Sequence, residues 1–169
     1  MGKASRKVYS SPERRYMATK VVARNRKARH DYHILDSLEV GIVLVGSEIK
    51  SVRDGRVSLK GAYADFDENG ELWLHDSHIA EYDMARDNHV PDRRRKLLAH
   101  GSELHRMRRR VQEKGYTLIP LDVHLRRGRA KVELGICRGK RQYDKRRDIA
   151  RREQNRRIRA AMKHEQRQG

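Results

Sequence analysis

Five residues between positions 65 and 76 come close to the pattern of an EF-hand calcium loop. Asp65, Asp67 and Asn69 alternate, Gly70 stands at the sixth place and Asp76 at the twelfth. That loop requires a helix on each side and usually a bidentate Glu as its last ligand. Here the flanking segments alternate like strands and the last ligand is an Asp. We therefore interpret the segment as a tight turn and expect no metal site.

Histidine and cysteine are the other residue types that could support metal binding or catalysis. Two histidine pairs have a spacing of three, His75 with His78 and His30 with His33. In a strand such residues point to opposite faces, so neither pair can readily bind one ion. Cys137 could pair with His124 across a hairpin as a nucleophile and its base, but no orienting third group or oxyanion hole is evident. We predict no catalytic constellation, no cofactor and no enzyme activity.

Positive charge is concentrated at the two ends of the chain. The net charge is +18 over 169 residues. Residues 1–29 carry 10 Lys and Arg with one acid, and residues 144–169 carry 10 with four acids. Only +3 therefore remains for residues 30–143, which are long enough to build one domain with a core. We predict a basic flexible arm over 1–22, a folded domain over 23–143 and a basic tail over 144–169.

Nucleic acid is the partner that this charge distribution favours, because clustered cations neutralise phosphates and release counterions. An amphipathic membrane helix would need large apolar residues opposite its basic face, and neither arm has them. A solubilising role for the arms is the open alternative. No apolar run of 18 residues and no signal peptide is present, so we expect a cytoplasmic protein without membrane contact. The single Cys137 cannot form an intramolecular disulfide.

The central region is rich in strand signals. Residues 32–45 predict a long strand that breaks near Asp36 and Ser37, with Gly41 at a bulge or bend. Two hairpins follow, over 62–79 around an Asn-Gly turn and over 121–136 around Arg126, Arg127 and Gly128. Pro120 predicts an edge or a bulge. We expect order to begin near Ala23.

Two helices and one long loop complete the predicted domain. Residues 47–53, capped by Ser47, and a segment that starts at Ser102 and ends near Gly115 have helical signals. The second helix places Leu104, Met107 and Val111 on one face, and its arginines are either solvated or in contact with RNA. Residues 81–95 predict a long exposed loop.

Together these elements favour a mainly β, OB-fold-like closed antiparallel barrel of about six strands with two or three helices. The tail is expected to be disordered when free. The chain has few aromatic residues for base stacking, so a folded RNA is the favoured ligand.

At these strands and helices the chain resembles the SsrA-binding protein (SmpB) family over most of residues 23–152. The resemblance rests on the stretches ARNRKARHDYHI (23–34), LEVGIVLVGSEIKSVRDGRVSLKGAYA (38–64), RKLLAH (95–100), EKGYTLIPL (113–121) and KVELGICRGKRQYDKRRDI (131–149). It implies a monomeric, non-enzymatic RNA-binding adaptor of trans-translation that binds the tRNA-like domain of tmRNA (SsrA RNA). In ribosome rescue, elongation factor Tu with GTP accompanies the alanyl-tmRNA to the stalled ribosome.

The resemblance also implies which residues bind RNA. Those of the folded domain are Asn25, Lys27, Arg29, Tyr32, Glu39, Leu98 and Lys131. Gly139 and Tyr143 match the hinge before the tail, and Asp144, Lys145 and Arg146 match its opening motif. The tail is expected in the empty decoding centre and mRNA channel, against 16S rRNA. From the residues alone, a surface ion pair for Glu39 and a core role for Leu98 remain open, and so does a ribosomal protein or a general OB-type RNA-binding protein.

Overall fold

The computed structural model describes residues 19–113 and 115–165, so most of the predicted arm over 1–22 lies outside the described residues. The helices are α2 (Ala28–Asp31), α3 (Gly46–Arg53), α4 (Gly101–Gln112) and α5 (Gln142–Glu165). The strands are β1 (Thr19–Arg24), β2 (Tyr32–Ile42), β3 (Val57–Ser58), β4 (Tyr63–Phe66), β5 (Leu72–His75), β6 (His78–Ile79), β7 (Arg95–Leu98), β8 (Tyr116–Arg126) and β9 (Arg129–Gly139). None of the described helices combines the length and apolar character of a membrane-spanning segment.

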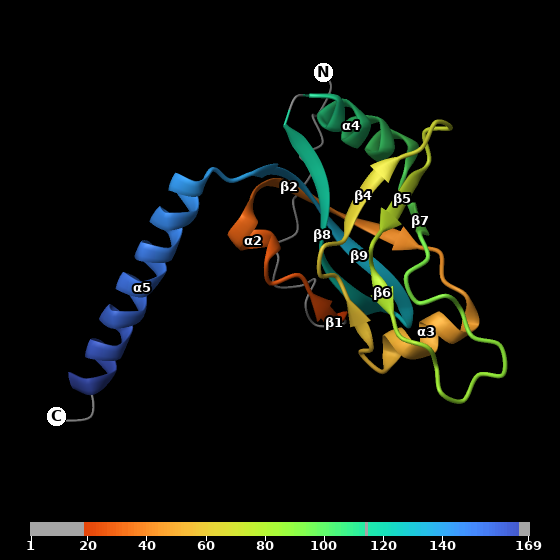
Figure 1. Cartoon of the computed structure of the whole chain (residues 1–169), viewed down its shortest axis with the longest axis horizontal. Helices are drawn as coiled ribbons and strands as arrows, with labels where there is room; N and C mark the ends of the chain where they lie inside the picture. Colours follow the sequence, from red (N-terminus) through yellow and green to blue (C-terminus); the bar gives the residue numbers. More distant parts are fainter. Residues whose placement is uncertain (1–18, 114, 166–169) are drawn as a thin grey trace, which may run out of the picture.

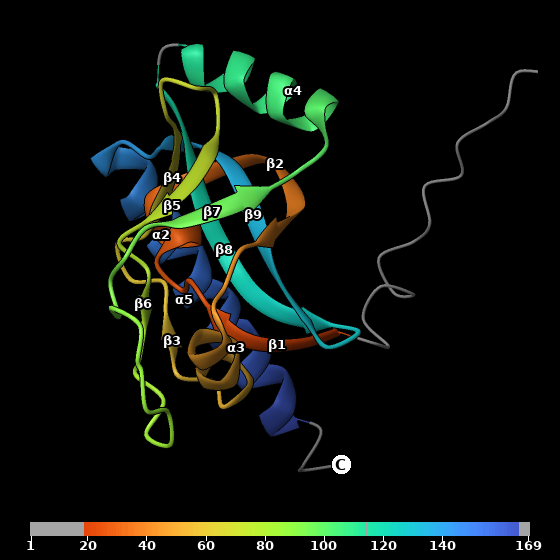
Figure 2. The same ribbon diagram turned by 90° about the vertical axis from the view of Figure 1, so that its right-hand side faces the viewer.

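Six strands close into a ring, in the order β8-β4-β5-β7-β2-β9 with β9 pairing back to β8. Every pairing is antiparallel. The mainly β, closed antiparallel architecture predicted from the sequence is therefore confirmed. Figures 1 and 2 show the long strands β2, β8 and β9 wrapping around the ring, with α4 across one of its ends.

The turn of the second hairpin lies where it was predicted, except that Arg126 is still the last residue of β8. Arg127 and Gly128 connect β8 to β9, and both have positive φ angles, 50° and 74°. A two-residue turn of this kind matches the twist of the paired strands. Pro120 is followed by a register shift in the β8–β9 pairing, which is the predicted bulge. The shift in β2 falls between Ile34 and Asp36, close to the predicted break.

The first hairpin and the first strand differ from the prediction. The segment predicted as one strand over 71–79 divides into β5 and β6, because Asp76 adopts a left-handed φ of 54°. Strand β6 then pairs with β3 in a separate small sheet. Strand β1 already includes Thr19, before the predicted beginning of order near Ala23, because it pairs with the far end of β8.

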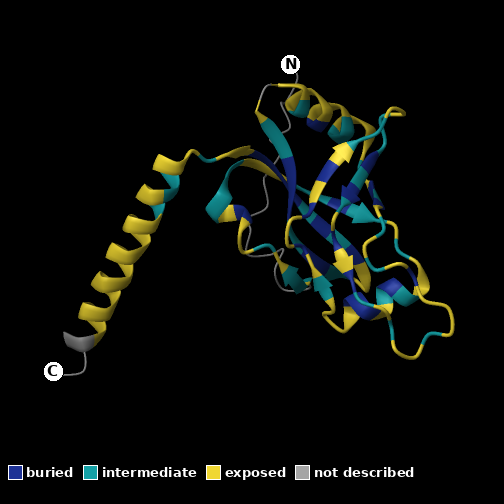
Figure 3. Ribbon diagram, viewed as in Figure 1, coloured by how far each residue is buried: buried dark blue, intermediate teal, exposed yellow. Residues whose placement is uncertain are grey.

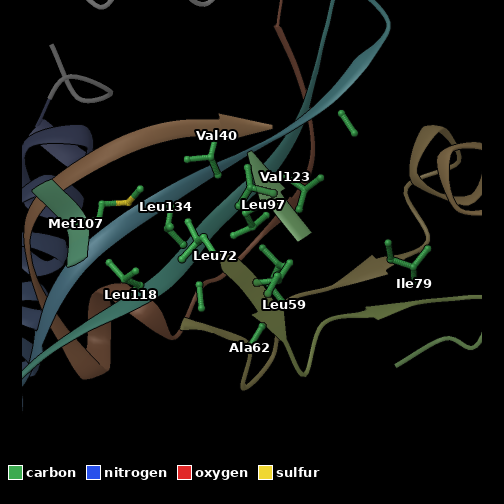
Figure 4. Close-up of a cluster of buried hydrophobic side chains, with 14 of the residues drawn as sticks. Val40, Leu59, Ala62, Leu72, Ile79, Leu97, Met107, Leu118, Val123 and Leu134 are labelled. Atoms are coloured by element: carbon green, nitrogen blue, oxygen red, sulfur yellow. The ribbon is translucent and has the colours of Figure 1, made fainter. Parts of the chain in front are cut away.

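The ring is filled by apolar side chains from all of its strands (Figure 4). Leu118 and Leu134 are completely buried, and Met107 of α4 reaches the same cluster. A smaller cluster of Ala28, Ile119 and Cys137 fixes α2 on the outside of β8 and β9. The core thus determines where both α2 and α4 sit.

The loop before β7 is not wholly exposed, contrary to the prediction for residues 81–95. Arg95 is completely buried and donates from Nε to Oε1 of the equally buried Glu48 at 2.9 Å. Arg93 donates to both oxygens of the same carboxylate, at 2.7 and 2.5 Å. The remaining guanidinium donors of Arg95 meet oxygens of Ser77, Arg93 and Pro91. This ion pair anchors the loop to α3.

The N-caps of helices α3 and α4 each lie two residues before the predicted ones. They are Val45 and His100 rather than Ser47 and Ser102. In α3, the Val45 N–H donates to the carboxylate of Glu48 at 2.9 Å. In α4, the His100 N–H donates to Glu103 at 3.0 Å. In both helices a glutamate of the first turn therefore accepts the N–H of the N-cap residue.

The tail over 142–165 is one continuous helix, α5, rather than the disordered segment expected of the free chain. It contains neither Gly nor Pro and consists largely of residues with high helix propensity. Its side chains are exposed over almost its whole length (Figure 3). Ile149, Ile158 and Met162 lie at the surface, so the helix contributes nothing to the core of the ring.

Candidate nucleic-acid interface

The structure brings the seven candidate RNA-binding residues of the folded domain into two groups along β2. Glu39, Leu98 and Lys131 lie together near the end of β2, where Gly41 pairs with both Leu98 and Lys131. The other four residues surround the helix α2, which precedes β2: Asn25, Lys27, Arg29 and Tyr32. Seven residues of strand separate Tyr32 from Glu39, which corresponds to roughly 23 Å.

Glu39 and Lys131 of the first group belong to a shallow basic depression of about 410 Å³, which is lined by Glu39, Arg126, Arg127, Arg129 and Lys131. We call these five residues the hairpin patch, since four of them come from the β8–β9 hairpin. The sequence analysis assigned Arg126 and Arg127 only to the turn and did not single out Arg129. Their adjacency to Glu39 arises from the pairing of β2 with β9, which a local pattern does not reveal.

Glu39 contacts one arginine and one histidine. Its carboxylate accepts from Arg126 Nη1 at 2.9 Å and lies 2.9 Å from His124 Nε2. Burial raises the pKa of Glu39, but the bonds from His124 and Arg126 outweigh it, so the net pKa is lowered. The ion pair that the sequence analysis left open for Glu39 is therefore present in the structure, with Arg126 as the partner.

Lys131 and Leu98 both face outward beside Gly41. Leu98 is 51% exposed, whereas its neighbour Leu97 is in the core, so Leu98 does not have the core role left open above. A Cβ on Gly41 would lie 3.3 Å from Leu98 Cβ and 3.8 Å from Lys131 Nζ. Within the described parts of the chain, Lys131 has no carboxylate within 4.0 Å. Its ammonium is therefore available to an anionic ligand.

His124 is almost buried and lies between two carboxylates. Its Nδ1 is 2.7 Å from Asp122, and its Nε2 faces Glu39. The bond to Asp122 is the main cause of a raised His124 pKa, with Glu39 contributing and burial opposing it. The ring is positioned so that protonation strengthens both bonds.

We predict a pH-dependent contribution of His124 to stability. A raised pKa stabilises the fold below the ordinary histidine value and loses that effect as pH rises through the folded pKa. The lowered pKa of Glu39 stabilises the fold above the ordinary glutamate value. The destabilisation caused by His124→Gln should therefore be largest between about pH 4.5 and 6.5 and smaller at pH 8.5. Urea denaturation of both proteins across this range tests it, and a pH-independent difference would contradict it.

The four residues around α2, which we call the α2 group, comprise one positioning residue, two exposed cations and one packed tyrosine. Asn25 donates from Nδ2 to the Pro120 carbonyl at 3.0 Å and accepts the Ala28 N–H at 3.2 Å. Its side chain therefore fixes the turn into α2. Lys27 and Arg29 are exposed. Tyr32 packs against the small cluster beneath α2. With Lys60, Asn25, Lys27 and Tyr32 line one depression of about 450 Å³.

The predicted hinge and tail residues lie at the end of β9 and in the first turns of α5. Gly139 ends β9 opposite Tyr32. Asp144 lies 3.6 Å from His33, and Lys145 lies 3.4 Å from Asp31. Tyr143 is 68% exposed, with the Arg147 guanidinium 5.6 Å from its ring centre. Arg146 is exposed.

Lys140, which the sequence analysis did not single out, connects the tail to α2. Its side chain is 6% exposed. The ammonium donates to the Arg29 carbonyl at 2.9 Å and to the Asp148 carboxylate, and it lowers the pKa of Asp148. The Lys140 N–H donates to the Asp31 carbonyl at 2.9 Å. A largely buried cation thus joins α2, the end of β9 and the second turn of α5.

The substitution Lys140→Met keeps the aliphatic stem but removes the cation. We predict that it lets α5 adopt a wider range of orientations relative to the ring. Burial raises the pKa of Cys137 to about 11, so cysteines introduced at the exposed Arg53 and Arg156 can be spin-labelled selectively. The parent chain should give one narrow distance distribution and the variant a broad one. Lys163→Met, at an exposed position of α5, is the matched control. An unchanged distribution in Lys140→Met would show that other contacts hold the helix.

The structure does not support chemistry at the rejected motifs. Cys137 is buried and pairs with Thr117, while His124 pairs with Lys131 near the other end of the hairpin, so the two side chains do not form a nucleophile and base. Asp67 accepts the N–H groups of Asn69 and Glu71 and thus stabilises the turn. Within residues 19–113 and 115–165, no group of three His, Cys, Asp or Glu could hold a metal ion.

The closed antiparallel ring carries basic residues in the hairpin patch and around α2, and a long basic helix follows it. This combination is typical of a small β protein that binds nucleic acid. Comparison with known families then gives the particular family. Residues 22–164 match the sequence model of the SmpB protein family, and the chain belongs to that family.

Curated relatives and a solved structure agree with this assignment. The chain is 56% identical over 146 residues to the SsrA-binding protein of Roseiflexus castenholzii, covering 85% of this chain and 92% of the relative. It is 54% identical over 140 residues to that of Desulfitobacterium hafniense, covering 82% and 89%. A chain in a structure described as "tmRNA-SmpB: a journey to the center of the bacterial ribosome" is 46% identical. It superimposes with a TM-score of 0.61, over 75% of this chain and 93% of that one.

Proposed function

We propose that this protein is a non-enzymatic adaptor that binds the tRNA-like domain of tmRNA and delivers it to stalled ribosomes for trans-translation. The observation that carries the proposal is its membership of the SmpB family across residues 22–164, which include both basic patches and most of α5. Its relatives are named SsrA-binding proteins. Delivery takes place in the cytoplasm, and elongation factor Tu with GTP accompanies the alanyl-tmRNA.

The folded part, residues 23–143, selects the RNA. In the hairpin patch, Lys131 supplies an unpaired ammonium for a phosphate, and Glu39 holds Arg126 in place. Beside the patch, the exposed Leu98 offers an apolar surface to a ribose or base. In the α2 group, Lys27 and Arg29 supply further exposed cations. Two contact points roughly 23 Å apart suit a folded RNA better than a single extended strand.

The tail, residues 144–169, detects whether the decoding centre and mRNA channel of the ribosome are empty. An exposed helix with arginines on all sides can enter a channel lined by RNA without burying an unpaired apolar face. In a ribosome whose decoding centre and mRNA channel are empty, this helix occupies the place of the missing message. Gly139, Tyr143 and the sequence Asp144, Lys145 and Arg146 set its point of departure from the ring.

Lys131→Ala tests the proposed tmRNA interface. Loss of one charge-assisted phosphate contact should weaken tmRNA binding about tenfold or more and reduce the salt slope of log K by about one. Lys50→Ala removes an exposed lysine from α3, away from both patches, and should leave both quantities unchanged. Titration of labelled tmRNA at several salt concentrations measures them. An unchanged slope for Lys131→Ala would place Lys131 away from any phosphate.

A further inference from the structure

Helix α4 presents a row of arginines on the side that faces away from the ring. Leu104, Met107 and Val111 pack against the core, and Met107 is fully buried. At 3.6 residues per turn, Arg106, Arg109 and Arg110 fall within roughly 100° of one another and lie outside the arc of these apolar residues. We call these three residues the α4 arginine face.

The charge of the α4 arginine face is scarcely neutralised by the protein. Arg106 lies 3.7 Å from Asp36, and both side chains are about half exposed, at 52% and 53%. In the described part of the chain, Arg109 and Arg110 have no carboxylate within 4.0 Å. Because Met107 fixes the helix to the core, these guanidinium groups are carried by a rigid element, which lowers the entropic cost of binding.

The composition of this face fits RNA phosphates rather than a protein partner. Protein interfaces usually have apolar or aromatic anchors at their centre. Helix α4, all of whose residues the structure describes, exposes no large hydrophobic side chain. Exposed arginines without such an anchor match the contacts that proteins make with nucleic-acid backbones.

The position of α4 identifies which RNA it meets. The chain leaves α4 and enters β8 at Tyr116, which pairs with Arg138, the residue before Gly139 at the root of α5. Helix α4 and the tail therefore lie at the same end of the ring (Figure 1). The hairpin patch lies at the other end of β8, ten residues of strand and roughly 33 Å away (Figure 2).

We propose that the α4 arginine face binds phosphates of ribosomal RNA while the hairpin patch holds tmRNA. This inference rests on the proposed function, because the end of the ring that sends the tail into the ribosome is the end that carries α4. The separation of the two surfaces allows both RNAs to be bound at once.

Salt-dependent binding of the full-length protein to vacant ribosomes, and in parallel to tmRNA, tests the inference. In Arg109→Gln/Arg110→Gln, the salt slope for ribosomes should fall by about two, one for each lost phosphate contact, while the slope for tmRNA stays unchanged. Arg109→Lys/Arg110→Lys keeps both charges and should retain most of the slope. Arg53→Gln/Arg86→Gln removes two exposed arginines elsewhere and should alter neither slope. Both glutamine substitutions are at exposed positions and should leave the thermal unfolding midpoint intact.

Three results would overturn the inference. If the ribosome slope in Arg109→Gln/Arg110→Gln equals that of the parent, the face is only solvated. A fall in the tmRNA slope alone would make tmRNA, not ribosomal RNA, its partner. Failure of the parent protein itself to bind ribosomes would remove the proposed function together with this inference, whereas the first two results leave that function standing.

Discussion

Removal of residues 144–169 should abolish peptide tagging on stalled ribosomes while tmRNA affinity changes by no more than a few-fold. The ring should stay folded, because α5 buries no large side chain in the core and touches the ring mainly through ion pairs at its root. Tagging can be measured by translating a message that lacks a stop codon in the presence of tmRNA. Gel-shift titration measures tmRNA binding in parallel.

A single substitution separates the charge of the tail from its helical structure. Ala150→Pro keeps every charge but costs the helix about 3 kcal/mol at an interior position. We expect it to lose most of the tagging activity, whereas Ala150→Gln should retain it. Full tagging by Ala150→Pro would show that charge alone is sufficient. Loss of tmRNA affinity by several orders of magnitude in the deletion would instead identify the tail as the main RNA anchor.

Glu48→Ala should destabilise the ring by about 3–5 kcal/mol, the largest effect that we expect of a single substitution. Glu48 and Arg95 are both completely buried. Burial lowers the pKa of Arg95 and is opposed by Glu48, so removal of the carboxylate leaves a buried cation without its counter-charge. Arg93 and the Val45 N–H lose the same acceptor.

An exposed ion pair provides the matched control. Glu71, next to β5, pairs with Lys96 of β7 at the surface of the ring, and both side chains are more than a third exposed. Glu71→Ala should therefore cost at most about 1 kcal/mol. Urea denaturation of the three proteins gives the comparison. Equal destabilisation by the two substitutions would show that the buried ion pair contributes no more to the free energy of unfolding than the exposed one.

Local signals were sufficient where the structure depends on neighbouring residues. The turn at Arg127 and Gly128, the bulge after Pro120 and the apolar side of α4 follow from backbone preferences and periodicity, and all three are present. Closure of the ring followed from the number of short antiparallel strands. The grouping of Glu39 with Lys131 required the resemblance to a family, because the two residues are far apart in the chain.

The features that the sequence did not reveal depend on tertiary contacts. Arg95 stands in a polar, arginine-rich run, and only its contact with Glu48 distinguishes it from the exposed arginines nearby. Lys140 looks like one more cation before the tail, yet it is largely buried between α2 and α5. Asp76 takes a left-handed conformation that no glycine signalled, and so the predicted long strand divides there.

The RNA that accompanies the protein tests the central claim most directly. The tagged full-length protein should be purified from its native cells at moderate salt, and the bound RNA should be sequenced. We expect one abundant species, tmRNA, in roughly stoichiometric amount, and much less of it with Lys131→Ala. Recovery of ribosomal RNA without tmRNA, or of mixed RNAs with equal affinity for any single strand, would contradict the adaptor function.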